Sequence, residues 1–372
     1  MTMRVFRDEA LRQYSESFNL AGRYAYLAAC AYDYETSLLT GDPTATSGAQ
    51  FMDSIMRTRS LGSVANGQPL VGGTYGDSGL ADAMARMKAD YDVLKGRLGF
   101  NNPQTEVSRM SLRTELYRTS PAPASDSTWQ NTLQLSWVDL TTIPEYNQYC
   151  KPFTPGSTNE PGLAIQFSST IMPGQNFFGQ DLAGGDNAYD PTHVATKIRS
   201  VGIWFSGYTN TFGVGLANAP YVYLVPVGTD RMRTATRDSG EIVRNWNVFD
   251  QALPVPYNIS SADLNQPSYI PYFDSLSENF GARRRFAALR AYHDSGNFST
   301  SELSTDARLI GRSVWNTMWL LLIPGRSLLN DPNEGLNRFI YGPLVSGSTT
   351  QRTMQGVTDI KLFFNTYSLA GD

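Results

Sequence analysis

The sequence contains little of what metal and nucleophilic chemistry requires, since its 372 residues include only two histidines and two cysteines. His193 and His293 have no second histidine or cysteine at metal-ligand spacing, which argues against a zinc site. Cys30 and Cys150 are too few for a disulfide framework, and we expect both to be buried thiols. The sequence therefore predicts neither catalytic residues of these types nor a bound cofactor, calcium excepted.

Long apolar runs are also missing. No window approaches the roughly 20 apolar residues that a membrane-spanning helix needs, so the sequence predicts no membrane span. The N-terminus is charged and lacks the apolar core of a signal peptide. A net charge of −4 and a pI near 5.4 argue against nucleic acid as a partner.

The opening segment contains a continuous heptad of apolar residues. This period is typical of a helix that packs against other helices. The heptad positions are Leu11, Tyr14, Phe18, Ala21, Ala25, Ala28 and Tyr32. A second apolar face includes Leu20 and Tyr34, and a helix that is apolar on two sides is normally surrounded by neighbours. We therefore expect the heptad to be the seam of a homo-oligomer.

A second helical pattern runs over Leu80–Leu98. Its apolar residues step by four and three, so the two segments predict an antiparallel helical hairpin. A further short helix is expected over Ser108–Arg118, which places a helical, bundle-forming region at residues 1–120.

After Gly99 the helical period gives way to short aromatic and β-branched runs divided by turn residues. Strands are expected at Leu163–Thr170, Lys197–Phe205, Tyr221–Val227, Met318–Ile323 and Thr358–Tyr367. Some of these runs carry large side chains on both faces, which is typical of a sandwich with a partly covered outer surface. The predicted fold is therefore α+β, with the helical hairpin followed by an antiparallel β-sandwich docking domain at residues 121–372.

One loop suggests a metal. Asp181, Asp186 and Asp190 occur in a glycine-broken segment, and oxygen-rich loops on β-sandwiches can bind calcium. The same residues also form Asx turns, which satisfy backbone donors without any ion. Both interpretations stay open at this point.

Five segments occur in an order that matches a known family. They are LAGRYAYLAACAYDYE at Leu20–Glu35, VSRMSL at Val107–Leu112 with Glu115 and Leu116, LQLSWVDLTTIPEY at Leu133–Tyr146, IRSVGIWFSGY at Ile198–Tyr208 and TDIKLFFNTY at Thr358–Tyr367. Together they resemble the C-terminal region of the A component of bacterial toxin complexes, which are large injection-type toxins. The first two segments resemble helices of that region, and the other three resemble strands of its β domain.

The resemblance implies an end-of-shaft module of a secreted or cell-surface bacterial protein. In that family the helices join a pentameric bundle, and the β-sandwich docks the B–C cocoon that carries the toxic enzyme. This sequence departs from the pattern at Ser206, where the family usually has proline, and in Asn176–Asp190 and Arg231–Tyr272, which have no counterpart. The pore-forming hairpin and the long shaft have no match either, so we do not expect this chain alone to be a complete toxin.

We therefore predict a non-enzymatic assembly and docking module. Trp246 and Arg284 are the predicted partner-binding residues, because aromatic and arginine side chains are the usual anchors of protein interfaces. The alternative is a carbohydrate-binding module, in which Trp129, Tyr189, Trp246 and Tyr292 would stack on sugars. Core packing would equally explain aromatic residues in such a domain.

Overall fold

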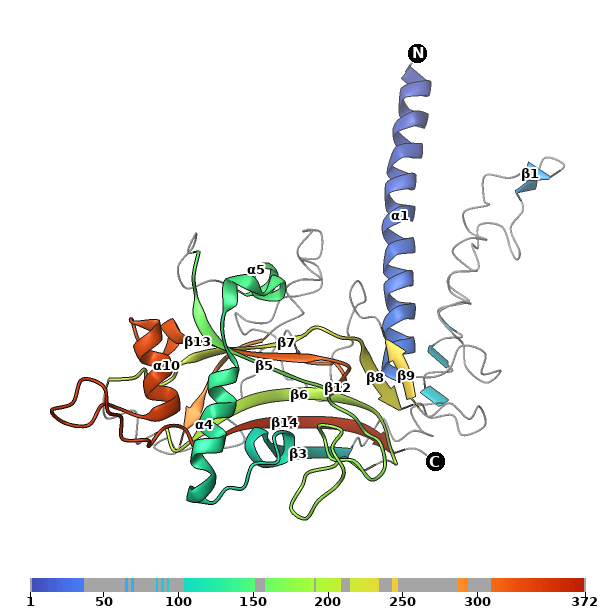
Figure 1. The fold of residues 1–372 in the computed structure, drawn as a ribbon. Helices are drawn as coiled ribbons and strands as arrows, with labels where there is room; N and C mark the ends of the chain where they lie inside the picture. Colours follow the sequence, from blue (N-terminus) through green and yellow to red (C-terminus); the bar gives the residue numbers. More distant parts are fainter. Residues whose placement is uncertain are drawn as a thin grey trace.

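The computed structural model describes residues 2–36, 104–150, 158–190, 192–208, 215–233, 243–246, 287–293 and 309–370, with a few isolated positions between 64 and 93. Within these residues, one long helix precedes a body built of β-sheets and short helices (Figure 1). The predicted α+β class, with an N-terminal helix followed by antiparallel sheets, is confirmed.

Helix α1 spans Thr2–Thr36 and contains all seven heptad positions. Figure 1 shows it projecting from the body, with its C-terminal end beside strands β8 and β9. Its predicted partner, Leu80–Leu98, lies mostly outside the described residues, and so does the pairing of the two helices. The described positions of that segment are helical and exposed, namely Ala85, Lys88, Ala89, Asp92 and Val93.

A five-stranded antiparallel sheet contains three of the predicted strands. Its order is β10-β7-β13-β5-β4, with strands at Ala287–Arg290, Tyr221–Pro226, Trp319–Pro324, Pro161–Phe167 and Trp137–Asp139. Strand β13 lies in the centre and pairs with β5 and β7. All six of its residues are buried, as expected for a strand covered on both faces.

A four-stranded sheet contains the other two predicted strands. Its order is β11-β6-β14-β3, with strands at Tyr292–His293, His193–Ser206, Asp359–Ala370 and Gln104–Ser111. Strand β14 pairs antiparallel with both β6 and β3, whereas the short pair of β11 and β6 is parallel. Strand β3 lies within residues 1–120 yet pairs with β14 at residues 359–370, so the first part of the chain is not only helical.

The two sheets share one hydrophobic core. Alternate residues of β14, including Ile360, Leu362 and Phe364, are fully buried and belong to the same cluster as Leu321 of β13. The rings of Trp319 and Phe364, one from each sheet, lie 6.2 Å apart. Figure 1 accordingly shows the two sheets as stacked layers.

A third, three-stranded sheet lies beside the end of α1. Its order is β12-β8-β9, with strands at Trp315–Asn316, Asp230–Arg233 and Val243–Trp246. A separate two-stranded pair joins β1, Val64–Ala65, to β2, Gln68–Pro69.

Two sequence predictions about the connecting segments are wrong. Residues 108–111 belong to strand β3 instead of a helix, and only Leu112–Leu116 that follow form a short π-helix, η2. The segment Leu133–Tyr146 was expected to be a strand but contains only the three strand residues of β4. Helix α4, Asp126–Leu135, includes the first residues of this segment. Trp129 and Leu133 are four positions apart, so they lie on the same face of the helix, and this face is buried.

Short helices complete the body. They are the 3₁₀ turns η3, Pro123–Ser125, and η4, Leu140–Thr142, and the α-helices α5, Pro144–Tyr149, α9, Gly325–Leu328, and α10, Pro332–Tyr341. Asp331 caps α10 by accepting hydrogen bonds from the backbone N–H groups of Asn333 and Glu334. Within the described residues, no helix is both long and apolar enough to cross a membrane.

Candidate functional site

The last turn of α1 enters the body, and Tyr34 is its most buried described side chain. The Tyr34 hydroxyl donates a hydrogen bond of 2.7 Å to Asp230 Oδ2 of β8 and accepts one of 2.8 Å from the backbone N–H of Ser313. Burial and the nearby Asp230 carboxylate raise the pKa of Tyr34 well above its usual value. The hydroxyl therefore stays protonated and acts as a hydrogen-bond donor.

Asp230 is the centre of this anchor. Besides Tyr34, its carboxylate accepts hydrogen bonds of 2.8 Å from Arg312 Nη2 and 2.9 Å from Asn316 Nδ2. The Asp230 and Arg312 side chains are almost completely buried. The backbone N–H of Ser313 adds a longer bond of 3.4 Å. A buried carboxylate is tolerated only when it is paired and hydrogen-bonded in this way, so the anchor depends on these donors.

A second buried ion pair holds Glu35, the residue next to Tyr34. Lys197 Nζ of β6 lies 3.3 Å from Glu35 Oε2 and donates hydrogen bonds to the backbone oxygens of Glu35 and Ala195. Burial lowers the pKa of Lys197, and the Glu35 carboxylate opposes that shift. The same ammonium group lies 5.6 Å from the centre of the Tyr34 ring and 5.8 Å from that of Tyr367, within cation–π range.

Aromatic contacts complete the anchor. Trp246 of β9 packs edge-on against Tyr34, with ring centres 5.5 Å apart, and Met232 of β8 joins them in a small buried cluster. The guanidinium of Arg244 lies 3.9 Å from the centre of the Trp246 ring. Trp246 is therefore buried beneath α1 and not exposed for a partner, which corrects its predicted role as a docking residue.

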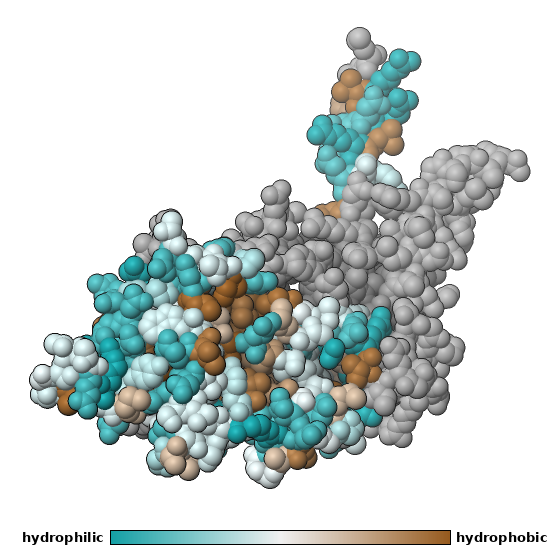
Figure 2. All heavy atoms as spheres, in the orientation of Figure 1, coloured by the Kyte–Doolittle hydropathy of each residue, from teal (hydrophilic) through white to brown (hydrophobic). Residues whose placement is uncertain are grey.

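The other half of α1 is exposed. Large apolar side chains there face solvent, with Leu11 58% and Tyr14 55% exposed. Figure 2 shows hydrophobic residues between hydrophilic ones on this projecting part. The exposed large apolar residues of α1 are Met3, Val5, Phe6, Leu11, Tyr14 and Leu20.

The predicted seam thus divides into two parts. Leu11 and Tyr14 are exposed, whereas Tyr32 is 7% exposed and lies in the buried end of the helix. Phe18, Ala21, Ala25 and Ala28 are helical, but their side chains lie outside the described part of the structure. An intermolecular role is therefore open to Leu11 and Tyr14, the first two positions of the seam, and not to Tyr32.

The three loop aspartates do not form a metal site in the structure. Both oxygens of Asp186 accept hydrogen bonds of 2.8 Å from Arg118 Nη1, and Asp190 accepts from the backbone and hydroxyl of Thr192. Arg118 also donates to the backbone oxygen of Asp181. No group of three or more potential metal-ligand side chains occurs among the described residues. The loop is closed by Asx-type hydrogen bonds and one arginine.

Most of the aromatic residues considered for sugar stacking are part of the core. Trp129 and Tyr189 are buried, Trp246 lies under α1, and Tyr292 is half-buried. Arg284, the other predicted partner-binding residue, lies outside the described residues. His293 is buried and its Nε2 lies 2.8 Å from the backbone oxygen of Asn218, which is a structural contact.

Sequence patterns did not reveal the residues that matter most for the anchor. Asp230, Arg312 and Lys197 come from three separate strands or loops, and nothing near each one in the sequence distinguishes it from a surface charge. The only available signal was the second apolar face of the first helix, which includes Tyr34.

No protein-family model matches the chain, and the search of curated proteins found no match.

Proposed function

We propose that the chain is a non-enzymatic assembly module, in which the projecting half of α1 joins copies of the same chain and the body docks a protein partner. The observation that carries this proposal is the row of exposed apolar side chains, including Leu11 and Tyr14, on a helix anchored at one end. Isolated helices are only marginally stable in water, and their stability in proteins comes mainly from packing an apolar face. Association with other copies would supply that packing.

The anchor supports the same proposal. A buried hydrogen bond from Tyr34 to Asp230 and an ion pair between Glu35 and Lys197 hold the last turn of α1, so the body restrains that end of the helix. A rigidly presented helix loses less conformational entropy when it associates than a flexible one. The heptad spacing of Leu11, Tyr14 and Phe18 is the spacing that coiled-coil seams use.

The assembly is tested by analytical ultracentrifugation of the full chain over a range of concentrations. Leu11→Asp should convert oligomers to monomers, because burying an unpaired carboxylate in a seam costs several kcal/mol. Arg12→Gln is the matched control, since it changes the net charge by the same amount on the polar side of the same turn. A monomeric wild type, or equal association of all three proteins, would contradict the assembly proposal.

The resemblance to toxin-complex A components supports a B–C cocoon as the docking partner. Biolayer interferometry with the full chain immobilised tests it, using wild type and Leu11→Asp against a purified B–C component. We expect both proteins to bind, because docking would use the body and not the seam. Failure of both to bind would remove the cocoon as the partner and leave the assembly proposal to its own test.

A further inference from the structure

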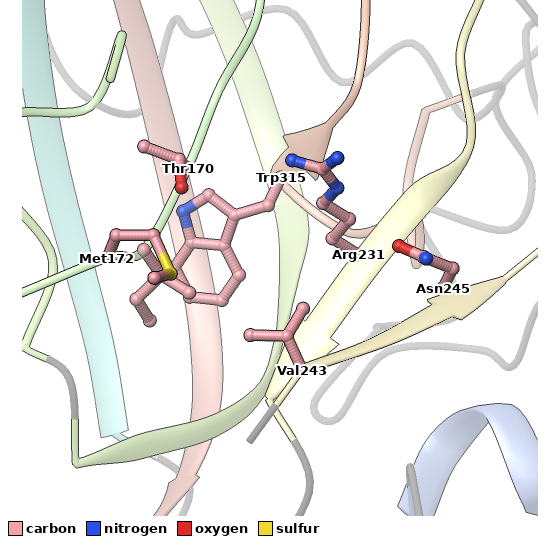
Figure 3. A pocket seen from close by; sticks show the side chains of 7 residues that line it. Thr170, Met172, Arg231, Val243, Asn245 and Trp315 are labelled. Atoms are coloured by element: carbon pink, nitrogen blue, oxygen red, sulfur yellow. The ribbon is translucent and has the colours of Figure 1, made fainter. Parts of the chain in front are cut away.

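A pocket of about 250 Å³ opens on the three-stranded sheet, away from the anchor of α1. It is lined by Thr170, Ile171, Met172, Arg231, Val243, Asn245 and Trp315. Figure 3 shows the indole of Trp315 between the Thr170 and Met172 side chains and that of Arg231. The pocket is smaller than the roughly 300 Å³ at which sites for drug-sized ligands begin, so it suits a small molecule.

The strand register explains how these side chains come together. Trp315 of β12 pairs with Arg231 of β8, and Arg231 pairs with Asn245 of β9. Residues that pair directly across strands project from the same face of a sheet. The three side chains therefore form one row across the sheet, and Val243, two residues from Asn245, lies on the same face.

The opposite face of the same sheet holds α1. Asp230 and Met232 flank Arg231 in β8, so they project to the other side, where they meet Tyr34 and Trp246. The sheet thus separates the anchor from the pocket, and the pocket has no evident part in holding the helix.

The polar groups of the pocket are mainly donors. Among the described residues, no carboxylate lies within ion-pair distance of the Arg231 guanidinium. Trp315 is fully buried, and its Nε1–H has no acceptor within the described part of the chain. Because this N–H has no accessible surface, it is not available to a ligand, and Arg231 is the charged donor of the pocket. The Thr170 hydroxyl and the Asn245 amide add further donors.

The remaining surface of the pocket is apolar. The Trp315 ring, Ile171, Met172 and Val243 provide it, and the described lining contains no acidic side chain for an ammonium group. We propose that this pocket binds a small organic carboxylate with an aromatic or branched aliphatic body. The carboxylate pairs with Arg231, and the apolar body lies against the accessible side chains of Met172 and Val243.

Phenylacetate is a suitable probe, and the full-length chain is the protein to test. Isothermal titration calorimetry measures the affinity, and the indole N–H region of a ¹⁵N spectrum locates the site. The chain has six tryptophans, so Trp315→Phe identifies the Trp315 signal by its loss. We expect saturable binding that shifts this signal.

Two comparisons test the role of the charge. Arg231→Gln should weaken phenylacetate binding about tenfold or more, because a charge-assisted hydrogen bond is lost. Arg109→Gln, at an exposed position on β3, makes the same change of charge elsewhere and should leave the affinity unchanged. Neutral phenylacetamide should bind the wild type about tenfold more weakly, which repeats the test without any mutation.

The outcomes decide the proposal. Absence of saturation up to tens of millimolar probe would overturn it, as would equal affinity for phenylacetate and phenylacetamide. Binding that is equally weakened by Arg231→Gln and Arg109→Gln would show a non-specific effect of charge and would also overturn it.

Discussion

The hydroxyl of Tyr34 and the carboxylate of Asp230 form a buried hydrogen bond of 2.7 Å between residues 196 apart in the sequence. This bond joins the last turn of the long helix to β8, the central strand of the three-stranded sheet. Because Asp230 also accepts from Arg312 and Asn316, the helix is attached to a charge network and not only to an apolar surface.

Tyr34→Phe should destabilise the protein by about 1–3 kcal/mol, because Asp230 loses a donor and the Ser313 N–H keeps only its longer hydrogen bond, of 3.4 Å, to Asp230 Oδ2. Urea unfolding followed by circular dichroism measures the change. Tyr341→Phe is the control, since the Tyr341 hydroxyl bonds to Gln134 at the surface and its loss should cost much less. Equal effects of the two substitutions would show that the Tyr34 hydroxyl contributes no special stability.

Removal of one partner of the Asp230 and Arg312 pair should cost about 3–5 kcal/mol, because the other charge remains buried without its counter-charge. We expect the double variant Asp230→Asn, Arg312→Gln to lose less than the sum of the two single variants. Urea unfolding of the four proteins gives this double-mutant cycle. Strict additivity would mean that the two side chains do not interact energetically.

Calcium should not stabilise the protein through the loop of Asp181, Asp186 and Asp190. Arg118 occupies both oxygens of Asp186, and a ligand raises stability only by binding the folded state. Thermal melts in millimolar calcium and in chelator should therefore coincide. If calcium raises the melting temperature, Asp186→Asn tests whether the effect arises in this loop.

Glu334 should make the protein more stable as the pH rises through the acidic range. Desolvation is the largest single influence and raises the pKa of Glu334, but hydrogen bonds from Arg352 and Arg338, together with their charges, lower it below 4.5. Between that lowered pKa and 4.5 the unfolded state binds more protons, so the contribution is lost as the pH falls through the folded pKa. Glu334→Gln should remove this slope from the free energy of unfolding, measured in urea from about pH 3 to pH 6.

Asp359 provides a contrast of opposite sign for the same measurement. Burial raises its pKa above 3.8, although the Ser111 hydroxyl and the Arg113 N–H partly offset the shift. The folded state then binds more protons, so this contribution is full below pH 3.8 and is lost as the pH rises through the folded pKa. Asp359→Asn should steepen the rise of stability with pH, whereas Glu334→Gln flattens it. Slopes that change in the same direction in both variants would contradict this assignment.

The strands that could be predicted from the sequence are those whose own residues carry the pattern. Strand β14 reads as a strand because Ile360, Leu362 and Phe364 alternate into the core. Strand β3 does not, since its run QTEVSRMS is largely polar and Val107 is exposed. It becomes a strand by pairing with β14, which local periodicity cannot reveal.

The site was harder to predict because its contacts are distant in sequence. The prediction places Trp246 in an interface because aromatic side chains are common interface anchors, but its ring packs against Tyr34 at the end of the first helix. The loop aspartates suggest calcium because they are close together in the sequence. Their actual cation is Arg118, which pairs with Asp186 from 68 positions away. In each case the residue type indicated an interacting side chain, but the sequence did not reveal the distant residue with which it interacts.

The position of β14 between β3 and β6 sets the order in which the chain can fold on the ribosome. Ser111 at the end of β3 bonds to Asp359 at the start of β14, 248 residues later. The four-stranded sheet therefore stays open at its centre while residues 207–358 are synthesised, and the inner edges of β3 and β6 wait unpaired. Loop closure over such separations is slow, and open edges of this kind favour aggregation. The four-stranded sheet can therefore close only after its last described strand has been synthesised.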